Sequence, residues 1–149
     1  MYLASFEGMS QPAVRFDTKI AVILRADLAP WQELNVTAFL ASGVAASAPE
    51  SIGEHYADAD GTKYLPLFGQ PVMVFSATGE RLKQALERTL ARDLMPAVFT
   101  ADMFTTGHDA ANRTVVAAVT RGDLDLVGLA LRGPRNAVDK ITKGLPLHP

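Results

Sequence analysis

The stretch from Lys19 to Trp31 reads KIAVILRADLAPW, and it decides how the fold is interpreted. After the lysine it is a short run of apolar, largely β-branched residues, which is typical of a strand buried on both faces. Asp27 and Pro30 then supply a capping residue and a first-turn proline, which are helix start signals. Because Pro49 sets the end, the sequence predicts a helix over residues 30–47.

This predicted helix has two different faces at about 100° per residue. The stripe that should face the sheet consists of Val36, Leu40, Gly43 and Val44. A second stripe combines small, polar and aromatic side chains, namely Trp31, Asn35, Ala38 and Ser42. Two interpretations of the second stripe stay open: another element covers it, or it faces a ligand.

Strands and helices alternate along the rest of the chain. Further strands are predicted at residues 71–75, 95–99 and 124–131, and further helices at 78–92, 109–118 and 135–143, the last ended by Gly144. This order predicts an α/β protein, a three-layer α/β/α sandwich with a four-stranded, largely parallel or mixed sheet. The first three strands are apolar on both faces, so we expect interior positions for them, with Val22, Val74 and Val98 buried. We expect one domain over residues 1–149, with residues 1–17 as an irregular lead-in.

A β-hairpin insertion is predicted near Asp60. Asp58-Ala-Asp-Gly61 lies between Tyr56 and Tyr64, and Asp-Gly flanked by strand-forming residues favours a tight hairpin turn. A calcium-binding loop is the alternative interpretation. It lacks its later ligands, because no glutamate follows at the required spacing.

The composition is that of a globular protein. The 149 residues are 48% hydrophobic and 20% charged, and a chain of this size can bury a substantial core. It has no cysteine, which excludes disulfides, thiolate zinc sites and a cysteine nucleophile. There is no membrane-length apolar run and no signal peptide pattern, so we expect a cytoplasmic protein with no membrane partner.

The charge balance argues against a nucleic-acid partner. Fourteen Lys and Arg face sixteen Asp and Glu, a net charge of −2, whereas proteins that grip a phosphate backbone usually carry a basic excess. The densest basic group consists of Arg132, Arg135, Lys140 and Lys143. We interpret it as a solvated helix face.

The familiar catalytic and cofactor motifs are absent from the sequence, which has no phosphate loop, GxGxxG, HExxH or GxSxG pattern. Its three histidines, His55, His108 and His148, are far apart, and His148 lies in a segment expected to be a loose tail. We therefore expect neither a metal nor another cofactor.

Polar residues are dense in the segment after the strand at 95–99. They are Thr100, Asp102, Thr105, Thr106, His108, Asp109, Asn112 and Arg113. In open α/β sheets, ligands bind outside the carboxyl ends of the strands. If the strands at 19–24 and 95–99 are neighbours, Asp27 and Asn35 face the same crevice as this segment.

The segment has a chemical and a structural interpretation. In the chemical one, His108 acts as a general base that Asp102 or Asp109 orients. In the structural one, Thr106 and Asp109 form a capping box for the following helix. Asn112 and Arg113 are then part of its solvated face.

Long segments from about Lys19 to the end of the chain carry a first resemblance. They read RADLAPWQELNVTAFLASG, KYLPLFGQPV, MFTTGHDAANR, LDLVGLALRGPRNAVDK and KGLPLHP. In this order they resemble an uncharacterised bacterial family, the one numbered two thousand among the domains of unknown function. The resemblance brings no established activity.

A second, more distant resemblance is to peptidyl-tRNA hydrolase II. Arg25, Asp27 and Leu28 look like the Arg-x-Asp-Leu turn that follows the first strand of that family. Residues 138–142 (VDKIT) and 145–147 (LPL) look like its final helix and its Leu-x-Leu end. The resemblance implies the fold of that family and a homodimer. Apolar residues without an obvious home between the helices and the sheet, such as Trp31, Phe68 and Phe104, also favour self-association.

The active-site positions of that family differ here. Where its first helix carries lysine, glutamine and histidine, this chain has Asn35, Phe39 and Ser42. Its Asp-x-Gly-x-Thr-Gln loop survives as Asp102 with Thr105 or Thr106.

The predicted function is the binding of a small ligand in a crevice at the carboxyl ends of the strands. The expected ligand-binding residues are Asp27, Asn35, Ser42, Asp102, Thr105, Thr106 and His108. The alternatives are a hydrolase of an ester or amide bond, such as that of peptidyl- or aminoacyl-tRNA, with Asp102 and His108 as catalytic candidates, or a non-catalytic interaction module.

Overall fold

The apolar run after Lys19 forms β1 (Thr18–Arg25) in a computed structural model that describes residues 14–149. β1 pairs in parallel with β4 (Val72–Ala77) on one side and antiparallel with β6 (Leu126–Pro134) on the other. β6 also pairs antiparallel with β5 (Ala97–Thr100), so the four-stranded sheet has the order β4-β1-β6-β5. The sheet is therefore mixed, with one parallel pair.

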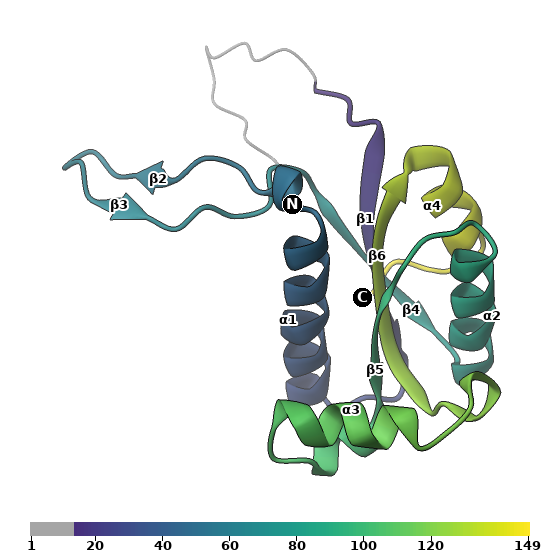
Figure 1. The fold of residues 1–149 in the computed structure, drawn as a ribbon. Coiled ribbons are helices and arrows are strands. Elements are labelled where there is room, and N and C mark those ends of the chain that lie inside the picture. The colour runs from purple at the N-terminus through teal and green to yellow at the C-terminus, as the bar shows by residue number, and fades with distance from the viewer. Residues whose placement is uncertain (1–13) are drawn as a thin grey trace.

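Helices cover both faces of the sheet (Figure 1). α1 (Pro30–Ser47), which has the predicted bounds, packs on one face through Val36, Leu40 and Val44. α2 (Gly79–Leu90) and α4 (Arg135–Thr142) pack on the other face. α3 (Asp109–Ala117) lies across the end of the sheet where β5 stops (Figure 1). The predicted α/β class and three layers are confirmed for the described residues.

Short 3-10 helices connect several of these elements. They are η1 (Pro49–Ser51), η2 (Ala101–Thr105) and η3 (Arg121–Asp123). Of the expected irregular lead-in, residues 1–13 lie outside the described residues, and residues 14–17 form no helix or strand. No helix in the described part of the chain has the length and apolar character that crossing a membrane requires.

The expectation that the first three predicted strands are interior is wrong for two of them. β4 and β5 are the outermost strands of the sheet, and Val74 and Val98 are only half-buried, whereas Val22 is buried. β4 is apolar because its side chains pack on the core clusters of both sheet faces, and the supposedly loose tail covers its outer edge. The backbone N–H of Ser76 donates to the Pro146 carbonyl at 3.0 Å, and that of His148 donates to the Val74 carbonyl at 2.9 Å.

The predicted hairpin is confirmed, and it projects away from the sheet (Figure 1). It consists of β2 (Tyr56–Ala57) and β3 (Lys63–Tyr64), and we call residues 53–67 the hairpin arm. Asp58 organises the turn: one carboxylate oxygen accepts the backbone N–H of Thr62 at 3.0 Å, and the other accepts the Tyr64 hydroxyl at 2.7 Å. The Tyr64 hydrogen bond is the main reason that the pKa of Asp58 lies below its usual value.

A glycine in β6 sets how closely α1 approaches the sheet. A Cβ atom on Gly128 would lie 2.7 Å from Cγ1 of Val36 and 3.0 Å from Cδ1 of Leu40. Both distances are shorter than the ~3.5–4.0 Å at which carbon atoms attract each other. The missing side chain therefore lets α1 lie directly on β6, which fixes the position of the α1 side chains beside β5.

Candidate functional site

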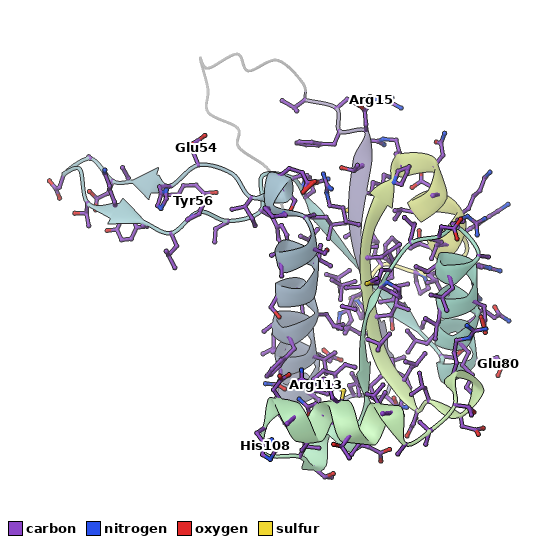
Figure 2. The ribbon with its side chains drawn as sticks, in the orientation of Figure 1. Arg15, Glu54, Tyr56, Glu80, His108 and Arg113 are labelled. Carbon is purple, nitrogen blue, oxygen red and sulfur yellow. The ribbon has the colours of Figure 1, made fainter. Side chains whose placement is uncertain are left out.

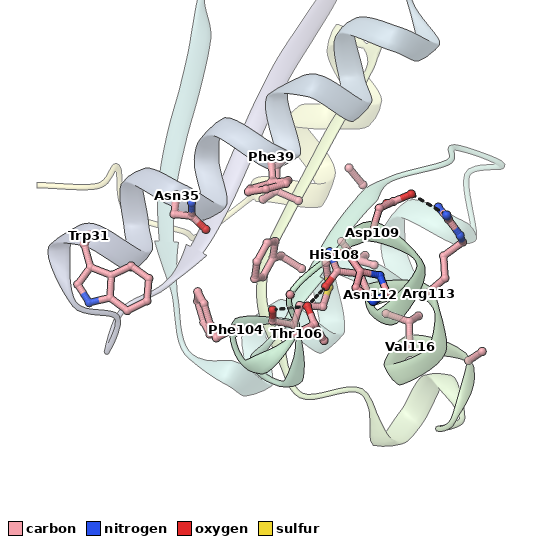
Figure 3. Close-up of a pocket in the computed structure, with 17 residues that line it drawn as sticks. Trp31, Asn35, Phe39, Phe104, Thr106, His108, Asp109, Asn112, Arg113 and Val116 are labelled. Carbon is pink, nitrogen blue, oxygen red and sulfur yellow. Dashed lines mark hydrogen bonds and ion pairs between the residues drawn. The ribbon is translucent and has the colours of Figure 1, made fainter.

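A pocket of about 720 Å³ opens between α1, β5 and the chain from η2 to α3 (Figure 3). Its apolar lining includes Leu40, Ala97, Val98, Phe99, Met103 and Val116. Among residues 14–149, α1 is the one long helix on this face of the sheet, and β5 is an outermost strand, so no second long helix of the described chain covers this side of the face. The chain turns back as η2 and α3 and forms the far wall. The pocket therefore follows from the unequal cover of the sheet.

Aromatic rings connect the floor of the pocket to its rim. The Phe99 ring is buried, and its centroid lies 5.1 Å from that of Phe104 and 5.9 Å from that of Phe39. Trp31 meets Phe104 edge to face at 5.7 Å, and Figure 3 shows both beside the opening. Trp31 and Phe39 are nevertheless 60% and 54% exposed. Large exposed rings next to a cavity mark a surface suited to binding.

The polar groups of the pocket lie on α1 and α3. Asn35 projects from α1, and Thr106 is hydrogen-bonded to Asn112 on the α3 side (Figure 3). Asp109 and Arg113 form an ion pair at 2.6 Å one helical turn apart, so their charges offset each other. The pocket therefore presents mainly neutral hydrogen-bonding groups to a ligand.

His108 immediately precedes α3, and its ring accepts a backbone hydrogen bond from the first turn of that helix. Its Nδ1 accepts the backbone N–H of Ala111 at 3.2 Å, which makes His108 the N-cap of the helix. The predicted capping box of Thr106 and Asp109 is therefore wrong: Thr106 bonds to Asn112, and Asp109 pairs with Arg113. An acceptor at Nδ1 places the proton of the neutral ring on Nε2. In this state His108 is a hydrogen-bond donor through Nε2 and has no free basic nitrogen.

The structure brings together three of the seven residues that sequence reasoning assigned to a ligand. Asn35, Thr106 and His108 line the pocket. Asp102 and Thr105 are exposed on η2 outside the lining, and the Thr105 hydroxyl donates to the Asp102 carbonyl at 2.8 Å. Asp102 and His108 are close in the sequence, but only His108 lines the pocket, because Asp102 lies on the η2 turn.

Asp27 and Ser42 also lie outside the pocket lining, each engaged locally. Arg25 donates through Nε to Asp27 at 2.7 Å and through its terminal nitrogen to Asp125 at 2.8 Å. The hydrogen bond from Arg25 is the main reason that the pKa of Asp27 lies below its usual value. This cluster joins the ends of β1 and β6. The Ser42 hydroxyl donates to the Phe39 carbonyl of its own helix.

We expected Asp27 and Asn35 to share one crevice with the segment after β5 if the strands at 19–24 and 95–99 were neighbours. They are not neighbours, because β6 lies between them. β1 and β5 still run in the same direction, because each is antiparallel to β6. Their carboxyl ends therefore meet at one end of the sheet. Within the part of the chain that the structure describes, no three His, Asp or Glu side chains are grouped to hold a metal ion.

Sequence reasoning missed the aromatic wall. Phe39 lies beside the polar stripe of α1 and Phe99 ends a buried strand, so their residue types did not indicate a site. A signal was available in Trp31 and Phe104, which had no place in the expected core. In the structure the Trp31 and Phe104 rings contact each other at the pocket rim.

Two comparisons with known proteins place this chain in a family. The model of a family described as Protein of unknown function (DUF2000) matches residues 18–149. A solved structure of a protein of unknown function from Agrobacterium tumefaciens strain C58 is 52% identical in sequence, with a TM-score of 0.88. The match covers 91% of this chain and all of that one. No curated protein matches this chain.

Proposed function

The chain belongs to the family described as Protein of unknown function (DUF2000), and from its pocket we propose that it binds a small, largely apolar ligand beside the carboxyl end of β5. The observation that carries this proposal is the wall of aromatic rings from buried Phe99 to exposed Trp31. The volume of the pocket, about 720 Å³, lies within the ~300–1,000 Å³ of typical small-molecule sites.

The lining indicates the chemical class of the ligand. A flat or aromatic group would stack between the rings on the α1 side and the Phe104 side of the pocket. The side-chain amides of Asn35 and Asn112 would hydrogen-bond the polar groups of the ligand, and Nε2–H of His108 would be a further donor. Because Asp109 neutralises Arg113, a neutral amide or hydroxyl on the ligand fits better than a strongly charged group.

The arrangement supports binding better than hydrolysis. A hydrolytic site needs a basic group within reach of a nucleophile or water, together with donors for the developing oxyanion. Here the His108 imidazole caps a helix through Nδ1, and Asp102 lies outside the lining. The residue that stands where peptidyl-tRNA hydrolase II has its lysine is Asn35, which carries no charge.

The fold of peptidyl-tRNA hydrolase II is part of the proposal, with the whole chain as one domain. The turn at Arg25-Ala-Asp27, the final helix α4 and the order of the elements support it. The hairpin arm and α3 are additions to that pattern. Limited proteolysis tests the single domain: cleavage at the ends or in the arm fits it, whereas two stable fragments of similar size contradict it.

The chain carries its own reporter for ligand binding, since Trp31 is its single tryptophan and lies at the pocket rim. We would titrate 4-nitrobenzamide, a flat ring that quenches indole fluorescence and carries a neutral amide. Saturable quenching is expected. Phe39→Ala should weaken it by about tenfold, which corresponds to the loss of one aromatic contact worth ~1.4 kcal/mol.

The matched control is Tyr64→Ala, which removes an aromatic of similar exposure outside the pocket, at 51% against 54% for Phe39. It should leave the quenching curve unchanged. Asn35→Leu keeps the size of the side chain and removes its amide, so it tests the polar contact by itself. Quenching that rises linearly with concentration, or that is identical in Phe39→Ala and wild-type protein, would contradict the proposal.

A further inference from the structure

The pocket runs along the outer edge of β5. Of the four residues of this strand the lining includes all but the last, so the cavity lies beside the strand. Val116 of α3 packs on the cluster under α2, on the opposite face of the sheet from α1, yet it lines the same pocket as Phe39 of α1. Figure 2 shows α3, with His108 and Arg113, at the end of the sheet where β5 stops. A cavity with walls on both faces, beside an outermost strand, includes the backbone edge of that strand.

Val98 turns its backbone groups towards this edge. Residues of an antiparallel strand alternate between bonding the neighbouring strand and facing away from it. Just beyond β5, the Ala101 N–H donates to the Asp125 carbonyl, which precedes β6, at 2.9 Å. The Thr100 N–H faces the other way and donates to the Met103 sulfur at 3.3 Å. Two residues earlier, Val98 has the same orientation as Thr100, since the register shift of this pair skips a residue of β6 and none of β5.

Among the described residues, Val98 presents the one open N–H group on this edge of the sheet. Within residues 14–149, no hydrogen bond from another part of the chain occupies its N–H or its C=O. Pro96, which precedes the strand, has no N–H, and the Met103 sulfur occupies that of Thr100. Edge strands usually offer a longer row of unpaired groups, to which another strand can add. This edge offers one donor with the acceptor of the same residue beside it, which matches a single residue of an extended peptide.

We propose that the ligand of this pocket is a short apolar peptide, bound by one extended residue that exchanges both backbone hydrogen bonds with Val98. The inference rests on the proposed function, since it assigns a ligand class to the same pocket. Peptides that add to a sheet edge bind through such main-chain hydrogen bonds and are selected through pockets for alternate side chains. Both features occur together here, because the Val98 edge and the aromatic wall line one cavity.

The alternation of side chains predicts which residue of the peptide enters the aromatic wall. Directly opposite residues of an antiparallel pair have their side chains on the same face, so the residue opposite Val98 points to the α2 side, near Val116. The preceding residue of the peptide lies opposite Phe99 and points to the α1 side, where the rings of Phe39 and Phe104 lie. An aromatic side chain there would pack against these rings. We therefore expect an aromatic residue followed by a small one.

The probe is N-acetyl-phenylalanyl-alanine methylamide, added to the full chain labelled with isotopic valine. At saturation the amide hydrogen exchange of Val98 should slow by about tenfold or more, because its N–H becomes hydrogen-bonded. Exchange at Val14, which is exposed and outside the pocket, should not change.

Two isomers of the probe test the orientation of the peptide. Methylation of the alanine nitrogen removes the donor to the Val98 carbonyl and blocks close approach to the strand, so it should weaken binding by about tenfold or more. Methylation of the phenylalanine nitrogen adds the same group where the peptide faces away from β5. This matched control should weaken binding by less than about threefold.

The 4-nitrobenzamide titration separates failure of this inference from failure of the proposed function. The dipeptide should displace 4-nitrobenzamide and restore the fluorescence of Trp31. If 4-nitrobenzamide quenches saturably but the dipeptide leaves Val98 exchange unchanged, or if the two methylated isomers bind equally well, the peptide is overturned and the pocket remains a ligand site. If neither compound binds, both proposals are overturned. A probe extended by glycines at both ends that binds about tenfold more tightly would overturn the single-residue contact, because a longer strand would then be adding to the edge.

Discussion

Replacing Gly128 by alanine tests whether the close approach of α1 to β6 builds the wall of the pocket. The new Cβ would lie 2.7 Å from Cγ1 of Val36 and 3.0 Å from Cδ1 of Leu40. Both contacts lie in a closely packed core, so α1 must move outward by roughly 1 Å to restore ordinary distances. Overpacking of this kind costs about 1–3 kcal/mol. For a chain of this length that is a fall in Tm of roughly 2–12 °C.

Urea unfolding measures this cost as a lower midpoint with an unchanged m value. Gly122→Ala is the control, because a Cβ there meets no atom within 4 Å, and it should be neutral or slightly stabilising. Val36→Ala removes the methyl group that clashes, so the double variant should cost less than the two single changes together, by roughly 0.5–3 kcal/mol. A Gly128→Ala protein within about 0.5 kcal/mol of wild type, or strictly additive effects, would refute the reasoning.

Two further predictions concern the stability of the protein, and a third concerns its activity. His108→Ala should cost ~1 kcal/mol in urea unfolding because it removes the N-cap of α3; if Thr106→Ala costs more than His108→Ala, the cap is misassigned. The hydrogen bond of His148 to the Pro149 carbonyl oxygen, and next its contact with Glu33, raise the pKa of His148 above its ordinary value of 6.5. The contribution of His148 to the free energy of unfolding is therefore fully present below pH 6.5 and is lost as the pH rises through the raised pKa. His148→Ala should therefore destabilise more at pH 5.5 than at pH 9, and an equal loss of unfolding free energy at both would contradict it. The protein should release no peptide from a model peptidyl-tRNA, because the proposed resemblance to peptidyl-tRNA hydrolase II puts the uncharged Asn35 where that family has a lysine, and because the net charge is −2. Release of peptide that Asp102→Ala abolishes would reverse this prediction.

The order of helices and strands was predictable because it depends on local patterns. The helix at residues 30–47 has the expected bounds, since a first-turn proline and a following proline fix both ends within the sequence itself. The position of a strand in the sheet depends on pairing between distant segments. Residues 95–99 are as apolar as β1, yet β5 is an outermost strand whose neighbour comes from residues 126–134. Alternation and composition contain no information on that neighbour.

The candidate site was predictable in part for the same reason. Asn35 and His108 could be identified because polar residues gather near the predicted ends of strands. Asp102 was grouped with His108 by sequence distance, but the tight η2 turn leaves it exposed outside the pocket. The pocket wall brings Phe39 from α1 together with Phe99 from β5, 60 residues later. Such a contact is set by tertiary packing, and aromatic residues alone do not distinguish a site from a core.

The central place of β6 has a consequence for how the chain folds. β1 begins at Thr18 and pairs with a strand that ends at Pro134, and β5 is attached to the sheet only through that strand. Until residues 126–134 insert between them, β1 and β5 have no shared partner, and Phe99 on the pocket floor lacks the β6 strand that it pairs with. Closing so long a loop before the main pairing forms carries an entropic barrier, which slows folding. The sheet and the pocket should therefore form in one late cooperative step, and a fragment that stops before β6 should have neither.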